Sequence, residues 1–106
     1  MMDTSDPYAP LWDQLNAAAA QATHGKGAER HDNGKPWLEQ PLFRLVETHG
    51  IGFATGQADK KTTEAMGMIA RGDHAAARRE LLGAIVYLAA ACHVLGDVRR
   101  APDERG

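Results

Sequence analysis

Apolar residues recur at helical spacing in four stretches of the chain, and turn-forming or capping residues separate these stretches. The first stretch predicts a helix that begins near Pro10 and places Leu11 and Leu15 on one face. Proline suits the first helical turn because the N–H that it lacks would have no partner there, and a serine or an aspartate at residues 5–6 can cap the helix. The run Thr23-His24-Gly25 is expected to end it.

A polar, glycine-rich segment at residues 25–36 predicts a loop. A second helix is expected to begin at Pro41 and to end before Gly50, and a third to cover residues 54–71. The third helix has few large apolar side chains. Its charged residues, Lys61 among them, are expected to form a face exposed to water, with pairs three or four residues apart.

The fourth stretch contains the longest run of apolar residues in the chain. Gly72 and Asp73 separate it from the third helix, because glycine is common just after a helix and aspartate is a good N-terminal cap. The predicted helix covers residues 73–95. Gly96 is expected to end it, and residues 97–106 are expected to form a flexible tail.

No stretch shows the alternation of apolar and polar residues that is typical of strands, so the predicted fold is all-α. We expect a single domain, residues 1–96, built as a compact bundle of about four helices around the long apolar C-terminal helix. That helix is apolar nearly all round, so either the other helices or a second copy of the chain must cover it. A chain of this size can just close around one helix, and a monomer is therefore expected rather than a homodimer.

The composition excludes several classes of protein. The 106 residues are 43% hydrophobic and carry a net charge of −2, whereas direct nucleic-acid binding needs a basic excess. The single cysteine, Cys92, rules out an internal disulfide and is expected to be a small core residue. The chain starts with an acidic segment rather than a signal peptide, and its apolar run of about fifteen residues is too short to span a membrane. The expected location is the cytoplasm.

No set of residues predicts a catalytic, metal or cofactor site. None of the five histidines lies four residues from another, and the zinc-binding pattern H-E-x-x-H is absent. Cys92 and His93 are adjacent, so their side chains leave a helix about 100° apart and cannot act as a nucleophilic pair. We therefore expect no catalytic residue, no metal and no cofactor.

Two tryptophans are candidates for contact with a partner. Trp12 and Trp37 combine a large apolar area with one hydrogen-bond donor, which is typical of interaction hot spots and also of residues that anchor a small core. Both interpretations stay open. Residues 1–24 contain three aspartates and no lysine or arginine, so Asp13, and Asp32 near the second tryptophan, could face a basic partner surface. A solvated surface explains these carboxylates equally well.

One glutamate on each of the last two predicted helices suggests a further comparison. With their surrounding residues, Glu64 and Glu80 resemble the MazG-like all-α nucleoside triphosphate pyrophosphohydrolases, which carry E-x-x-E on one helix and E-x-x-D on the next. In that family four carboxylates hold magnesium and the triphosphate, and Mg²⁺ needs several oxygen ligands. Gly67 and Gly83 stand where the second carboxylate of each pair belongs. The resemblance implies either a pyrophosphohydrolase or a catalytically dead nucleotide-binding relative.

In size and character the whole chain is similar to small phage-type anti-CRISPR proteins of the type I-E group, although no single motif carries this resemblance. It implies a non-enzymatic inhibitor that binds a component of a bacterial type I-E CRISPR interference machinery, a host defence protein complex, and blocks it sterically. The incomplete set of carboxylates and the near-neutral charge make this the leading prediction. Direct contact with nucleic acid or a membrane is not expected.

Overall fold

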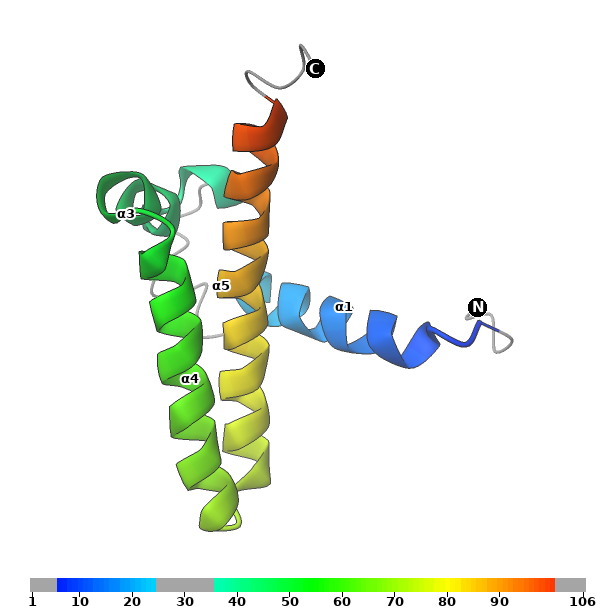
Figure 1. The fold of residues 1–106 in the computed structure, drawn as a ribbon. Helices are drawn as coiled ribbons and strands as arrows, with labels where there is room; N and C mark the ends of the chain where they lie inside the picture. Colours follow the sequence, from blue (N-terminus) through cyan, green and yellow to red (C-terminus); the bar gives the residue numbers. More distant parts are fainter. Residues whose placement is uncertain (1–5, 25–35, 101–106) are drawn as a thin grey trace.

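The computed structural model describes residues 6–24 and 36–100. Its elements are α1 (Ala9–His24), the short 3-10 helix η1 (Trp37–Glu39), α3 (Pro41–His49), α4 (Gly52–Ala70) and α5 (His74–Arg100). The described ranges contain no strand, and their α-helices α1, α3 and α4 lie around α5 (Figure 1). The all-α bundle is therefore confirmed. The predicted loop, apart from Pro36, and the last six residues of the predicted tail lie outside the described residues.

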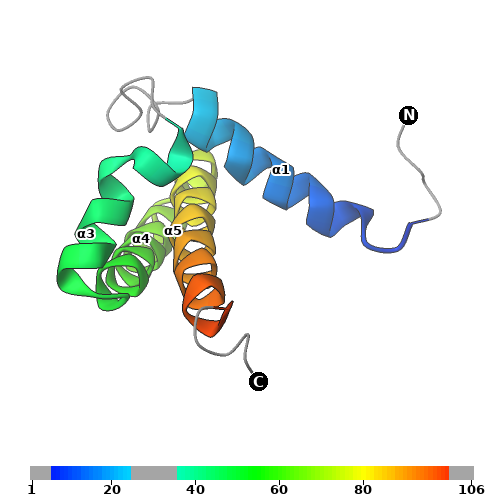
Figure 2. The ribbon, with the colours of Figure 1, turned by 90° about the horizontal axis from the view of Figure 1, so that it is seen from above.

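α4 and α5 form an antiparallel hairpin, and the two helices lie side by side in Figures 1 and 2. Gly72 has a φ of 80°, a left-handed conformation that glycine adopts without steric cost. Its N–H donates to the Ile69 carbonyl at 2.9 Å, which closes the last turn of α4. The Asp73 carboxylate accepts the N–H of Ala76 at 3.3 Å and caps α5. The break predicted at Gly72 and Asp73 is confirmed.

The C-terminal end of α5 differs from the prediction. Gly96 does not end the helix, which continues to Arg100. A glycine inside a helix costs only about 1 kcal/mol relative to alanine, so packing against other elements can override it. Here Val94 packs against the core cluster that Val46 of α3 and Ala54 of α4 form with Ala91 of α5. This contact packs α5 on the bundle two residues before Gly96.

Small side chains form most of the core. Eight of the ten buried apolar residues in the described ranges are alanines, and the other two are Val46 and Leu82. Alanine allows helices to approach closely, but each one removes little apolar area from water. Most of the larger apolar side chains therefore occupy half-buried and exposed positions.

α1 lies across the hairpin rather than along it (Figures 1 and 2). Its C-terminal half contacts α5, with Ala18 buried between the helices. Its first turn extends away from α5 (Figure 1). Pro41 begins α3 and Gly50, with a φ of 90°, ends it, as the sequence predicted.

One helix in the described part of the chain, His74–Gly96 of α5, is long and apolar enough to cross a membrane by length and composition alone. The prediction that no segment is long enough to span a membrane rested on the uninterrupted apolar run alone, whereas the helix also includes the residues before that run. A core helix of a soluble protein passes the same test. α5 packs against both α4 and α1, and its first turns carry Arg78, Arg79 and Glu80.

Candidate functional site

The N-terminal half of α1 exposes a continuous apolar face. Tyr8, Leu11, Trp12 and Leu15, which we call the docking face, are all exposed, and Trp12 is 53% accessible. These residues have the spacing i, i+3, i+4 and i+7, which places them on one side of a helix. In a surface helix such a stripe normally packs on the protein's own core. Here it is open to solvent.

The start of α1 is fixed locally, so the docking face is well ordered from its first residue. The N–H of Tyr8 donates to the Asp6 carboxylate at 2.8 Å, and this turn leads the chain into the helix. The carbonyl of Tyr8 then accepts the N–H of Trp12 at 3.1 Å. Asp6 is one of the two residues that the sequence proposed as a cap. Ser5, the other, lies outside the described residues.

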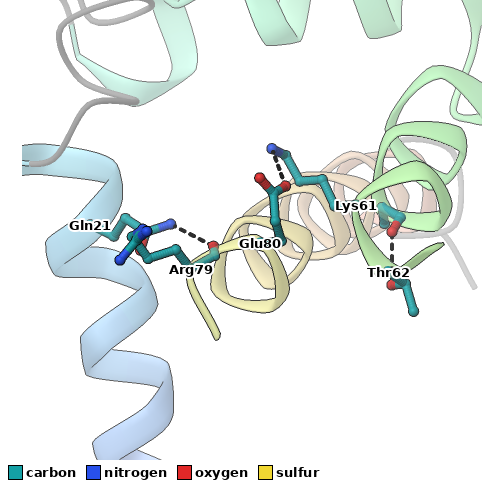
Figure 3. Close-up of polar contacts among 6 residues, drawn as sticks. Gln21, Lys61, Thr62, Arg79 and Glu80 are labelled. Atoms are coloured by element: carbon teal, nitrogen blue, oxygen red, sulfur yellow. Dashed lines mark hydrogen bonds and ion pairs between the residues drawn. The ribbon is translucent and has the colours of Figure 1, made fainter. Parts of the chain in front are cut away.

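Two hydrogen bonds attach α1 to α5, one at Gln14, between Trp12 and Leu15, and one at Gln21. Arg78 Nη2 donates to Gln14 Oε1 at 2.9 Å, and Gln21 Nε2 donates to the Arg79 carbonyl at 3.0 Å (Figure 3). Together with the buried Ala18, these contacts anchor the middle and C-terminal part of the helix. The docking face therefore belongs to a helix whose far half is held by the hairpin.

The charge next to the docking face is negative. Asp13 is exposed and follows Trp12 by one residue, so its side chain leaves α1 about 100° from that of Trp12, on the side away from Leu11 and Leu15. Asp6 stands at the start of the helix. Asp32, the other predicted acidic contact, lies outside the described residues.

Trp37 has a different environment from Trp12. It is half-buried in η1, and its ring packs edge-on against Phe43 with 4.9 Å between ring centroids. His93 of α5 completes the cluster at 5.9 Å from Phe43 and 6.3 Å from Trp37. The sequence left two roles open for each tryptophan, core packing and contact with a partner. Trp37 packs between η1, α3 and α5, whereas Trp12 is exposed and available to a partner.

Glu64 and Glu80 have separate surroundings. Glu64 is exposed, whereas Glu80 Oε1 lies 3.4 Å from Lys61 Nζ in an ion pair between α5 and α4 (Figure 3). Within residues 6–24 and 36–100, no group of three His, Cys, Asp or Glu side chains is placed to hold a metal ion. The alternative nucleotide site therefore gains no further ligand from these ranges.

Gly83, which occupies a carboxylate position of the MazG-like pattern, has a structural role. A Cβ added there would lie 3.1 Å from Lys61 Cδ, so the glycine gives the lysine side chain room to cross α5. Lys61 Nζ also lies 5.9 Å from the centre of the Tyr87 ring, within reach of a cation–π interaction. Lys61, expected on a water-exposed face, instead links α4 to α5.

Cys92 corrects another expectation. It was expected in the core, but it is exposed on α5, because no described element covers that side of the helix. His93, the next residue, points into the aromatic cluster with Trp37 and Phe43. The two side chains leave the helix in different directions, as their adjacency predicted.

Most of the docking face was not predicted from the sequence. Helical spacing placed Leu11 and Leu15 on one face of the first helix, and that face was expected to pack in the core. The spacing of Tyr8 and Trp12 with these leucines predicts a single apolar stripe. The same spacing is found whether such a stripe packs on the protein's own core or on a partner, so the pattern alone does not distinguish the two cases.

Comparisons with known proteins supply no evidence for function, so the docking face is the main evidence. No family model, no curated protein and no solved structure matches the chain. The described residues form a small helical protein that exposes an apolar face at the start of α1, with the Asp6 carboxylate at its first residue.

Proposed function

We propose that the protein is a non-enzymatic binding module that inserts the docking face of α1 into an apolar groove on a partner protein. The observation that carries this proposal is the exposed stripe at positions i, i+3, i+4 and i+7 of α1. This is the arrangement of anchor residues when an amphipathic helix binds in a hydrophobic groove. Trp12 supplies the largest apolar surface and is the expected hot spot.

The partner groove should be apolar at its base and basic at its rim. Residues 1–24 carry a net charge of −3, and the Asp6 carboxylate accepts the N–H of Tyr8, the first residue of the apolar stripe. Basic groups around the groove would attract these carboxylates, orient α1 and speed association. The apolar contacts would supply most of the affinity.

The proposed partner is a component of a type I-E CRISPR interference machinery, and the proposed effect is steric inhibition. This identification rests on the resemblance in size and character to phage-type anti-CRISPR proteins. The geometry is compatible with a steric mechanism, because α1 is held across the α4–α5 hairpin by Gln14 and Gln21. Insertion of the docking face would therefore bring the whole hairpin against the partner.

A capture experiment in a host with active type I-E interference tests this proposal. The tagged protein should retain a component of the interference machinery, and its expression should protect a targeted plasmid. Bait carrying Leu15→Lys in the docking face should lose both effects, whereas bait carrying Leu38→Lys, at another exposed apolar position, should keep them. If the wild-type protein retains no interference component and protects no plasmid, the proposed partner is wrong.

A further inference from the structure

A second apolar surface runs along α5, separate from the docking face. Leu81, Ile85, Leu88, Cys92 and Leu95 follow one another at spacings of four, three, four and three residues. The three leucines are 39%, 47% and 51% accessible, Cys92 is exposed and Ile85 is half-buried. We call these five residues the leucine seam.

The other helices leave the leucine seam open because they contact the remaining sides of α5. Lys61 of α4 crosses α5 at Gly83. Gln14 of α1 accepts a hydrogen bond from Arg78. Trp37 of η1 packs near His93. Along the described residues, the long helix is thus covered on the sides facing α4, α1 and η1 and uncovered along the seam.

We propose that a second copy of the chain covers the leucine seam, with α5 packed against α5. These residues recur every 3.5 positions on average. This is the repeat that keeps one side of a helix facing a partner helix over several turns. From Leu81 to Gly96 the sequence contains no Asp, Glu, Lys or Arg. The seam therefore offers nothing to a charged partner surface, whereas an identical seam matches it in length, spacing and lack of charge.

A twofold dimer satisfies this geometry, because the same patch is used on both copies. Leu88 lies at the middle of the seam. It faces Leu88 of the partner subunit whether the two helices run in the same direction in register or in opposite directions. The monomer expected from the sequence required the other helices to cover α5. The exposed leucines show that they do not cover this side of it.

The size of the seam sets the expected strength of the dimer. Fifteen helical residues extend about 22 Å, so this single strip is smaller than the roughly 800 Å² that each partner buries in a standard stable interface. The dimer should therefore dissociate on dilution, with a dissociation constant in the micromolar range. Self-association of this kind does not involve Trp12, so it can be tested apart from the proposed partner binding.

Sedimentation of the purified chain over a range of concentrations provides the first test. The mass should rise from 11.4 kDa toward twice that value as the concentration increases. Leu88→Lys should hold the protein at the monomer mass. Met66→Lys, at an exposed apolar position on α4, should dimerise like the wild type. Circular dichroism should show equal helicity in all three proteins. A wild-type protein that stays monomeric at every concentration would overturn the proposal.

Disulfide trapping provides a second test, and it does not depend on a disruptive charge. In a Cys92→Ser background, Leu88→Cys should form a covalent dimer on mild oxidation, because residue 88 faces itself across the seam. Met66→Cys in the same background should crosslink much more slowly. Equal crosslinking rates at the two positions would mean random collision and would contradict the dimer.

A lipid bilayer is the competing occupant of an uncharged apolar helix face. Flotation with neutral phosphatidylcholine vesicles separates the two cases. We expect the protein to remain in the aqueous fraction as a dimer. If it stays monomeric in solution and floats with the vesicles, and Leu88→Lys abolishes flotation, the seam contacts lipid and the dimer proposal is wrong.

Discussion

Lys61 on α4 and Glu80 on α5 form an ion pair with 3.4 Å between Nζ and Oε1, and the lysine reaches the glutamate by crossing Gly83. About a quarter of each side chain is exposed to solvent, since the accessible fractions are 24% and 25%. Both members of this contact lie in the segments that resemble a nucleotide pyrophosphohydrolase. In this chain they join two helices whose shared core consists mainly of alanine.

A double-mutant cycle should measure this ion pair. Lys61→Met and Glu80→Gln should each lower the free energy of unfolding by about 0.5–1 kcal/mol, because a partly exposed ion pair contributes modestly. The double variant should lose less than the sum of the two, which leaves a coupling of about 0.5 kcal/mol. Urea unfolding gives all four values. Strict additivity would show that the two side chains do not interact in solution.

Gly83→Ala should stabilise the protein, and Lys61 should limit the gain. Replacing glycine by alanine inside a helix is worth roughly 0.5–1 kcal/mol. In the wild-type background the new methyl group meets Lys61 Cδ at 3.1 Å, so the flexible lysine must shift and part of the gain is lost. In a Lys61→Ala background the full gain should be recovered. A loss of stability in both backgrounds would show that the crowding does not come from Lys61.

The cap at the start of α5 should contribute measurably to stability. Asp73→Ala removes the acceptor of the Ala76 N–H and should cost about 1 kcal/mol in the free energy of unfolding. Asp73→Asn keeps a side-chain oxygen at the same place and should cost much less. Thermal or urea unfolding distinguishes the two variants, and equal losses for both would indicate that the cap is not formed.

The alternative function makes a separate prediction about magnesium. With Glu80 paired to Lys61, and no group of three metal-ligating side chains in the described residues, we expect no magnesium-dependent release of pyrophosphate from any deoxynucleoside triphosphate. A chromatographic assay of the four nucleotides with and without Mg²⁺ checks this. Pyrophosphate release that Glu64→Gln and Glu80→Gln both abolish would establish the MazG-like activity in place of the proposed function.

Local signals in the sequence predicted the helices well. α3 runs from Pro41 to His49, where proline and glycine bracket an apolar stretch, and the capping pair Gly72 and Asp73 separates α4 from α5. These boundaries follow from interactions within a few residues. Gly96 misled the prediction because its local preference is weak, and α5 packs on the core cluster through Val94, two residues before it, a contact between distant parts of the chain.

The candidate site was less accessible to sequence reasoning. The sequence identified Trp12 as a candidate but could not separate it from Trp37, since both are tryptophans near a proline. Their environments differ because α1 crosses the hairpin and leaves Trp12 exposed, whereas η1 folds onto Phe43 and His93 (Figure 1). Helix orientation of this kind depends on packing between remote elements, and no local pattern encodes it.

The affinity of the isolated interference component for two matched variants tests the central claim most directly. Trp12→Ala removes the largest side chain of the docking face, and loss of a hot spot of about 2 kcal/mol or more should weaken binding roughly thirtyfold. Leu38→Ala removes an apolar side chain of similar exposure, 52% against 53%, and should leave the dissociation constant unchanged. Calorimetric titration of both variants gives the comparison. Equal affinity of the Trp12→Ala variant and the wild-type protein would contradict binding through α1.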